Sequence, residues 1–210
     1  SATYDGKILA LPTELETLGL FYDDTLLQSE GITPPTTWDE LKSAADKLTT
    51  DSRYGLVLPV EDSGYTLFNF WPFMWMAGAD VTDSEGNYTV DSPEMADALD
   101  FWGSFQQSGD SPATLQIGPW DVGNIATGVA AMQESGSYAI KATETDYKDA
   151  SIQAMSLPSP DGKGFVTVAG GQKLAVNAAS KHVEEAAGFI FSGFGSDDIS
   201  VACGLLTHVK

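Results

Sequence analysis

Cysteine and histidine are scarce in this sequence, and their scarcity excludes two kinds of site. The 210 residues contain a single cysteine, Cys203, so the chain can form no internal disulfide. Because Cys203 lies in an apolar, glycine-containing stretch, we expect a small buried side chain rather than a nucleophile. The two histidines, His182 and His208, have no partners at metal-ligand spacing, so the sequence indicates no metal site.

Basic residues are also few. The 10 lysines and arginines are outnumbered by 30 acidic residues, which gives a net charge of -20 at pH 7. A surface of this charge repels phosphate backbones and anionic membranes, so it excludes nucleic acid as a partner. The acidity is typical of a highly solvated surface. Recruitment of a cationic ligand such as a polyamine is the open alternative, although no dense run of carboxylates favours it.

Long apolar runs are missing as well. The richest stretch, residues 68–79, reaches about half of the ~20 residues that a membrane-spanning helix needs. No basic segment with an apolar stretch behind it opens the chain, so no signal peptide is recognisable, and regular structure is expected directly after Ser1. We therefore interpret the sequence as part of a longer protein. Hydrophobic residues make up 42%, which is enough for a packed core.

Strand and helix patterns alternate along the chain. Asp5-Gly6 predicts a tight turn, and Thr37 with Glu40 forms a capping box that predicts a helix over 38–48. The expected strands are 8–11 (buried), 18–22, 54–59, 88–90, 129–133, 151–157, 165–169 and 174–176, and the expected helices are a short one after Asp23, then 38–48, 68–79, 92–105, 120–127, 180–191 and 196–202. This alternation is typical of the α/β class.

Several segments follow one another in the order and spacing of a known family. They are 4–12 (YDGKILALP), 16–23 (ETLGLFYD), 31–41 (GITPPTTWDEL), 129–132 (VAAM), 136–140 (GSYAI) and 169–171 (AGG). Together they resemble the family 1 extracellular solute-binding proteins of the maltose-binding type, over nearly the whole chain. The resemblance implies a periplasmic binding protein-like (type II) fold, in which two α/β lobes are joined by crossing strands and hold a sugar in the cleft between them.

The resemblance also implies a domain division and a function. Residues 1–17 are expected to be a first-lobe strand and hinge, 18–165 the second lobe, and 166–210 the hinge return with part of the first lobe. The chain is expected to be truncated at both ends. The implied protein is the extracytoplasmic substrate-binding component of an ABC importer. It would bind a mono- or oligosaccharide without turnover or cofactor and deliver it to permease subunits in the membrane.

Three positions match the ligand-binding residues of that family. Sugar recognition needs aromatic faces against the C–H face of the ring and polar groups for the hydroxyls. By resemblance, Glu16 is the hinge-side carboxylate, Phe68 stands in place of a stacking tyrosine, and Tyr138 stands in place of a stacking tryptophan. Gly136 and Ser137 lead into Tyr138. We expect the three matching side chains to converge on one concave surface.

Five further residues are candidate ligand contacts. Glu14 lies two residues before the matched carboxylate, so on an extended segment both side chains point the same way. Trp71 and Trp120 offer aromatic faces, although an aromatic residue on a helix is usually a core residue. Gly171 is expected at the hinge crossing, where a missing side chain allows close backbone approach. Gln172, which follows it, is expected to point into the cleft.

Two other classes of function stay open. A glycoside hydrolase also combines aromatics with paired carboxylates, here Glu14, Glu16 or Glu61, but no motif supports such a pair. A binding protein for a non-sugar solute such as a polyamine is compatible with the acidity. Thr66 replaces a sugar-binding glutamate of the family, which argues against maltose itself. Gly170-Gly171 lacks the spacing of a nucleotide-binding loop.

Overall fold

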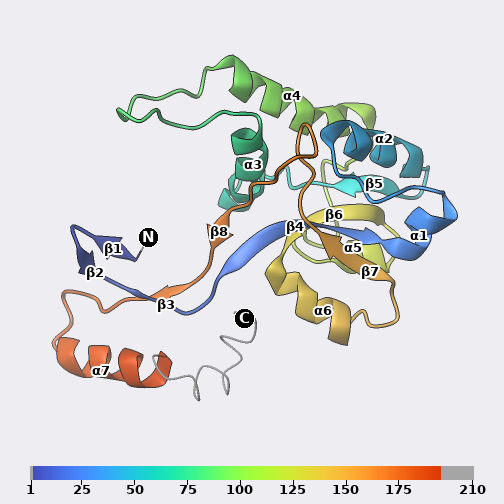
Figure 1. The fold of residues 1–210 in the computed structure, drawn as a ribbon. Coiled ribbons are helices and arrows are strands. Elements are labelled where there is room, and N and C mark those ends of the chain that lie inside the picture. Colours follow the sequence, from blue (N-terminus) through green and yellow to red (C-terminus); the bar gives the residue numbers. More distant parts are fainter. Residues whose placement is uncertain (1, 195–210) are drawn as a thin grey trace. The chain divides into compact units, whose positions relative to one another are not determined.

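The computed structural model describes residues 2–194 (Figure 1), so Cys203, His208 and the expected helix over 196–202 lie outside the described residues. The chain divides into two compact units. One comprises residues 1–16 and 169–210, of which 2–16 and 169–194 are described, and the other comprises residues 17–168. None of the helices in the described range combines the length and apolarity that a bilayer crossing requires.

The larger unit is built on a mixed sheet with the strand order β5-β6-β4-β7. These strands are β4 (Glu16–Asp23), β5 (Tyr54–Val57), β6 (Ala130–Gly136) and β7 (Ile152–Met155). β5 runs parallel to β6, whereas β4 is antiparallel to both of its neighbours, with Leu20 opposite Glu134 on β6 and Met155 on β7. All seven residues of β6 are buried, which makes it the central strand of the unit.

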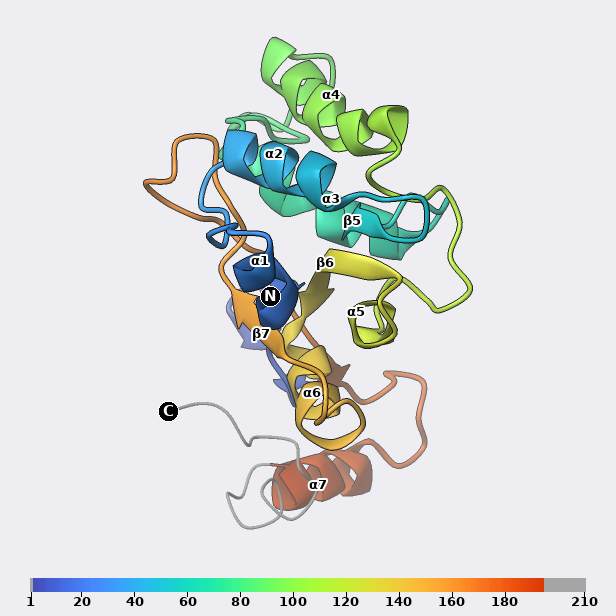
Figure 2. The same ribbon diagram turned by 90° about the vertical axis from the view of Figure 1, so that its right-hand side faces the viewer.

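Helices cover both faces of this sheet. The bounds are α1 (Asp24–Ser29), α2 (Trp38–Leu48), α3 (Gly64–Met76), α4 (Pro93–Ser108), α5 (Gly123–Ala126), the 3-10 turn η1 (Ser137–Ala139) and α6 (Ile140–Thr145). Figures 1 and 2 show α2 and α4 on one side of β6 and α5 and α6 on the other. The main hydrophobic cluster contains residues of the four helices α1, α2, α3 and α4 and of the sheet. A smaller cluster forms around Phe21, Val122 and Ile125.

Local capping signals place two of these helices where the sequence predicts them. The Thr37 hydroxyl accepts from the backbone N–H of Glu40, and the Glu40 carboxylate accepts from the backbone N–H of Thr37, so the capping box is confirmed. Ser92 accepts from the backbone N–H of Met95 and begins α4, with Pro93 in its first turn. The ring of Trp38 stacks on Phe101 at 4.2 Å between centroids and ties α2 to α4.

α3 begins four residues earlier than the apolar run predicts. Ser63 is its N-cap and accepts a hydrogen bond from the backbone N–H of Thr66. The polar cap, rather than the first phenylalanine, sets the start, because it satisfies backbone donors that the first turn leaves free. Tyr65 therefore lies in the first turn of the helix, where the sequence analysis expected a loop.

Two predicted strands after α3 are wrong or shortened. Residues 88–90 form no strand, because the Asp83 carboxylate gathers the backbone N–H groups of Glu85 and Asn87 into a turn and only a single bridge joins Thr82 to Tyr88. The strand expected over 165–169 is reduced to Ala169–Gly170 (β8), since residues 165 and 166 are exposed. The helix expected over 120–127 is limited to α5, and α6 was not predicted.

The smaller unit contains short strands and one helix. Its elements are β1 (Thr3–Tyr4), β2 (Lys7–Ile8), β3 (Leu11–Pro12), β8, β9 (Lys173–Leu174) and α7 (Val183–Phe194). β1 and β2 form a hairpin through Asp5 and Gly6, whose φ angles of 49° and 69° confirm the predicted turn. The buried strand expected over 8–11 is wrong, because Ile8 is 75% exposed. Its strand, β2, pairs with β1 in a two-stranded hairpin, and this pairing leaves the Ile8 side chain uncovered.

Candidate functional site: an aromatic cluster in the larger unit

Three aromatic side chains from separate segments meet in the larger unit. Tyr65 comes from the first turn of α3, Trp120 from the loop before α5, and Tyr138 from η1 directly after β6. The Tyr65 and Tyr138 hydroxyl oxygens lie 2.7 Å apart, and either can donate to the other. The Tyr65 and Trp120 rings meet edge to face, with 6.1 Å between centroids and 90° between planes. We call these three residues the aromatic cluster.

The end of β6 fixes the position of Tyr138. The Tyr138 ring folds back over Gly136, where a Cβ atom would lie 2.1 Å from the ring carbon Cε1. Only a glycine leaves room for the ring at this point. The Ser137 hydroxyl between them accepts from the backbone N–H of Thr17 at 3.3 Å, which attaches this turn to the start of β4. Gly136 and Ser137 thus position the aromatic residue that the sequence analysis singled out.

Trp120 has a similar support. A Cβ atom at Gly118, two residues earlier, would lie 2.4 Å from the Trp120 ring. Ser135 on β6 connects the Trp120 backbone to the Tyr138 side chain, because its hydroxyl lies 2.9 Å from the Trp120 carbonyl oxygen and 3.4 Å from the Tyr138 hydroxyl. The Trp120 side chain is 52% exposed and the Tyr138 side chain 37%, so both rings present a face to solvent.

The cluster carries neutral polar groups. Burial, the neighbouring Tyr138 and the carboxyl of Glu134 all raise the pKa of the Tyr65 hydroxyl far above its ordinary value, so it stays protonated. Glu134 on β6 is buried, and burial raises the pKa of its carboxyl well above the usual range. Apolar ring faces beside uncharged hydroxyl groups are the combination that suits a neutral, hydroxylated ring.

Phe68 and Trp71 lie elsewhere on α3. Phe68 is partly buried and packs against the main hydrophobic cluster. Trp71 is exposed, and its ring contacts Trp75 at 6.0 Å between centroids. The hydrogen bonds and ring contacts that hold the aromatic cluster together involve neither residue. A ligand contact for either stays a prediction.

The remaining candidates belong to the smaller unit. Glu14 Oε1 accepts from the backbone N–H of Gln172 at 3.2 Å, so this carboxylate braces the backbone beside it. Gly171 has a φ of 126°, and a Cβ atom there would lie 2.2 Å from the Glu14 carbonyl oxygen, which agrees with the expected close approach. Burial and the neighbouring charge of Glu14 raise the pKa of the Glu16 carboxyl. A ligand contact at any of these four residues stays a prediction.

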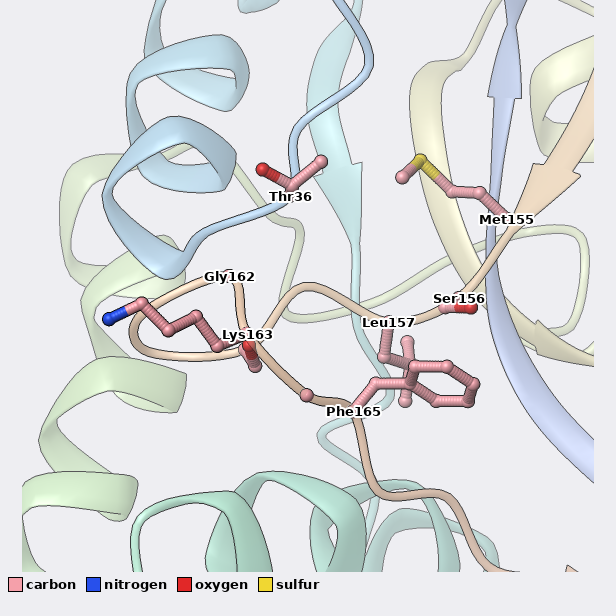
Figure 3. A pocket seen from close by; sticks show the side chains of 9 residues that line it. Thr36, Met155, Ser156, Leu157, Gly162, Lys163 and Phe165 are labelled. Atoms are coloured by element: carbon pink, nitrogen blue, oxygen red, sulfur yellow. The ribbon is translucent and has the colours of Figure 1, made fainter.

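A pocket in the larger unit is lined by none of the aromatic-cluster residues. It has a volume of about 470 Å³ (Figure 3). Thr36 lines one side, and the end of β7 with the chain that follows it lines the other, including Met155, Leu157 and Phe165. Its buried polar group is the Ser159 hydroxyl, for which no protein partner lies within hydrogen-bond distance. Nothing in this lining selects a ligand class, so we place the site at the aromatic cluster.

No cluster of three or more His, Cys, Asp or Glu side chains suited to a metal occurs in residues 2–194.

Four residues in or beside the aromatic cluster were not predicted from the sequence: Tyr65, Glu134, and also Gln133 and Asn124, which contact the main chain before α5. Tyr65 escaped notice because the start of α3 was placed too late, and the signal that marks it is Ser63. Gln133 and Glu134 are polar residues inside a fully buried strand, and polar residues at such positions indicate buried hydrogen bonding. Asn124 carries no recognisable signal at all.

The chain matches one protein family over most of its length. The family described as bacterial extracellular solute-binding protein matches residues 1–198. A probable ABC transporter-binding protein of Deinococcus radiodurans is 29% identical over 202 residues, which are 90% of this chain and 47% of that protein. The putative ABC transporter periplasmic-binding protein YcjN of Escherichia coli K12 is 34% identical over 86 residues, 40% of this chain and 20% of its own length. The chain thus spans about half or less of these relatives.

Solved structures agree with this assignment. The cyclic alpha-maltosyl-1,6-maltose binding protein of Arthrobacter globiformis superposes with a TM-score of 0.75 and 29% identity, covering 94% of this chain and 51% of its own. The maltose-bound MalE3 of T. maritima gives a TM-score of 0.81 and 25% identity, covering 95% and 53%. The mixed α/β fold of periplasmic solute-binding proteins is therefore confirmed. On the family match and the shared fold, this chain belongs to the bacterial extracellular solute-binding proteins.

Proposed function

We propose that this chain is part of the extracytoplasmic substrate-binding component of an ABC importer, and that it binds a mono- or oligosaccharide at the aromatic cluster without chemical turnover. The observation that carries the proposal is the meeting of Tyr65, Trp120 and Tyr138, with paired hydroxyls and two half-exposed ring faces. A pyranose has an apolar C–H face and a rim of hydroxyl groups, and the cluster matches both.

The chemistry of the cluster favours sugar over the alternatives. A polyamine is best held by ionised carboxylates. The carboxyl that acts on the Tyr65 hydroxyl is that of Glu134, which is buried and whose raised pKa favours the neutral form. The Asp121 carboxylate, next to Trp120 in sequence, already accepts from the Gly123 backbone N–H and the Tyr147 hydroxyl. A glycoside hydrolase needs two carboxyl groups facing each other across the bond to be broken. Glu61 is exposed. Glu14 and Glu16 are neighbours on one segment, and the Glu14 carboxylate accepts a backbone N–H, so these two stand side by side and do not face each other across a bond.

The relatives support the ligand class and the partner. Two structures that resemble this chain are named for maltose and for a cyclic maltosyl-maltose. The relatives in the two bacteria are named as ABC transporter-binding proteins, which points to permease subunits in the membrane as partners and to a periplasmic or cell-surface location. The proposed division into a second lobe over 18–165, with first-lobe and hinge segments over 1–17 and 166–210, follows from the same relationship.

Calorimetry on the longest natural polypeptide that contains this chain tests the proposal. The ligands are maltose, longer and cyclic malto-oligosaccharides, common monosaccharides, and spermidine as the cationic competitor. We expect at least one sugar to bind, Tyr138→Ala and Trp120→Ala to weaken it about tenfold or more, and Tyr88→Ala, an exposed tyrosine outside the cluster, to leave it unchanged.

Three outcomes would overturn the proposal. They are binding of spermidine but of no sugar, equal affinities in wild type and both cluster variants, and release of nitrophenol from nitrophenyl glycosides. The last would identify an enzyme instead of a transport protein.

A further inference from the structure

The backbone before α5 is held by buried side chains of the central strand. The side-chain amide of Gln133 donates from Nε2 to the Pro119 carbonyl oxygen at 2.6 Å. The Ser135 hydroxyl lies 2.9 Å from the Trp120 carbonyl oxygen and donates to it. Both side chains are fully buried, and they lie two residues apart on β6, so they leave the strand on the same face.

A third buried side chain, that of Asn124 on α5, completes this support from the other end of the loop. Asn124 Nδ2 lies 3.3 Å from the Gly118 carbonyl oxygen and 3.0 Å from that of Asp121. The same nitrogen lies 3.2 Å from Gln133 Oε1, so the two amides also contact each other. Four consecutive carbonyl groups, from residue 118 to residue 121, therefore face donors from three buried side chains.

The use of polar side chains here is informative. A central buried strand is normally filled with apolar residues, because a buried amide or hydroxyl is costly unless it is hydrogen-bonded. Gln133 uses both ends of its amide, one on the loop and one on Asn124. One of its hydrogen bonds thus holds the main chain next to Trp120, and the other holds Asn124. An apolar side chain of the same size would fill the space but would not hold the loop in place.

The result is an exposed ring on an immobilised backbone. The Trp120 side chain is 52% exposed, although the carbonyl of its own residue and those on either side are all held. Gly118 leaves the space that the ring occupies. Exposed loops are otherwise among the more mobile parts of a protein.

We propose that Gln133, with Asn124 and Ser135, is a positioning residue that holds Trp120 in its ligand-binding orientation before any ligand arrives. The inference rests on the proposed function, because it gives Trp120 a role in sugar stacking. A preformed ring face spares the ligand the cost of ordering the loop and side chain, which for one immobilised side chain corresponds to about a two- to tenfold gain in affinity.

The first test needs no ligand. The protein is labelled with 5-fluorotryptophan, and the Trp120 signal in the fluorine NMR spectrum is assigned with Trp120→Phe. Wild type is expected to give one narrow Trp120 signal. Gln133→Met keeps the side-chain length but removes both hydrogen bonds, so this signal should broaden or split while that of the buried Trp102 stays in place. Gln153→Met, at an exposed glutamine on β7, is the matched control and should leave the spectrum unchanged. A narrow, unshifted Trp120 signal in Gln133→Met would overturn the inference.

The second test separates positioning from general loss of structure. Gln133→Met is expected to weaken the sugar identified by calorimetry about three- to tenfold in a wild-type background and to have no further effect in a Trp120→Ala background. Equal losses in both backgrounds would show that Gln133 does not act through Trp120. If Gln133→Met does not fold, Ser135→Ala replaces it, because it removes only a hydroxyl. Absence of all sugar binding in wild type would refute the proposed function, and the NMR spectra would still decide the positioning.

Discussion

The hydroxyl oxygens of Tyr65 and Tyr138 lie 2.7 Å apart, although 73 positions separate the two residues in the chain. This contact joins the start of α3 to the turn η1 after β6, and the Tyr65 ring also meets the Trp120 ring edge to face. The relationship makes Tyr65 the residue through which the two exposed rings of the aromatic cluster are connected. Four predictions follow from this site and the core beneath it.

Removal of the Tyr65 hydroxyl should weaken sugar binding with little effect on folding. Tyr65→Phe keeps the edge-to-face ring contact but removes the 2.7 Å contact of the Tyr138 hydroxyl, which retains the longer contact of 3.4 Å with the Ser135 hydroxyl. We expect affinity to fall about three- to tenfold and the free energy of unfolding to fall by about 1 kcal/mol. Calorimetry and denaturant unfolding measure the two effects. Tyr88→Phe is the control, and a Tyr65→Phe variant with wild-type affinity would contradict the role given to this hydroxyl.

A methyl group at Gly136 should displace Tyr138. Because a Cβ atom would lie 2.1 Å from the ring, Gly136→Ala must swing the ring away from Tyr65. We expect roughly a tenfold loss of sugar affinity, corresponding to about 1.4 kcal/mol. Gly103→Ala on α4 is the matched control, since the nearest side-chain atom there is 3.6 Å away and alanine favours a helix. Equal affinities of the two variants would show that the Tyr138 ring is free to move.

Glu134 should make the protein less stable as pH rises. Burial raises the pKa of its carboxyl well above its ordinary value, so the folded state holds this proton more tightly than the unfolded chain does. The stabilisation is complete below the unfolded pKa and is lost as pH rises toward the folded pKa. Glu134→Gln keeps a neutral side chain of the same shape and removes this loss.

The measurement is the difference in unfolding free energy between Glu134→Gln and wild type from pH 4 to pH 8. We expect the variant to gain relative to wild type as pH rises. Glu144→Gln, at an exposed residue of α6, should show no such trend. Parallel profiles of Glu134→Gln and wild type would mean that the buried carboxyl loses its proton as readily as in the unfolded chain.

Asp110 should have the opposite pH dependence. This buried carboxylate, just after α4, accepts hydrogen bonds from Lys42, Ser108 and Thr49. Burial acts to raise the pKa of Asp110, but the hydrogen bonds and the positive charge of Lys42 outweigh it, so the pKa is lowered. Its contribution is therefore present above the unfolded pKa and is lost as pH falls through the lower, folded value.

Asp110→Asn is expected to lower the free energy of unfolding by about 1–3 kcal/mol at pH 7 and to reduce the loss of stability in acid. Urea unfolding at pH 3 and pH 7 measures both effects. The control is Asp100→Asn, at an exposed position on α4, the helix that ends just before Asp110. A variant that loses stability by the same amount at both pH values would contradict the assignment.

Local signals in the sequence predicted the parts of the fold that local contacts determine. The capping box of Thr37 and Glu40 and the Asp5-Gly6 turn involve residues within a few positions of each other, so their energies do not depend on the rest of the chain. The same holds for the α/β class, which follows from the alternation of patterns. Tyr138 was identified by resemblance, and Tyr65 was missed with the cap at Ser63.

Predictions that depended on distant partners were less successful. Strand 129–133 was ended too early, because Glu134 and Ser135, which continue it, are polar and interrupt the apolar pattern. Ser135 is tolerated in the buried strand through its hydrogen bond to the Trp120 carbonyl oxygen. The exposure of Ile8 was missed because it too depends on contacts with distant parts of the chain. An apolar pattern predicts burial only where a packing partner exists, and periodicity does not report the partner.

The two glycines beneath the aromatic rings have a consequence for how binding preference can change. The Trp120 and Tyr138 rings each lie against the backbone of a glycine two positions earlier, Gly118 and Gly136. Because these glycines have no side chain, none has to move there when another aromatic residue replaces Trp120 or Tyr138. An engineer or natural selection can therefore vary the aromatic residue, and with it the solute that is retained, while the peptide support stays constant. The glycines themselves have no such freedom, since any larger residue there competes with the ring for the same volume.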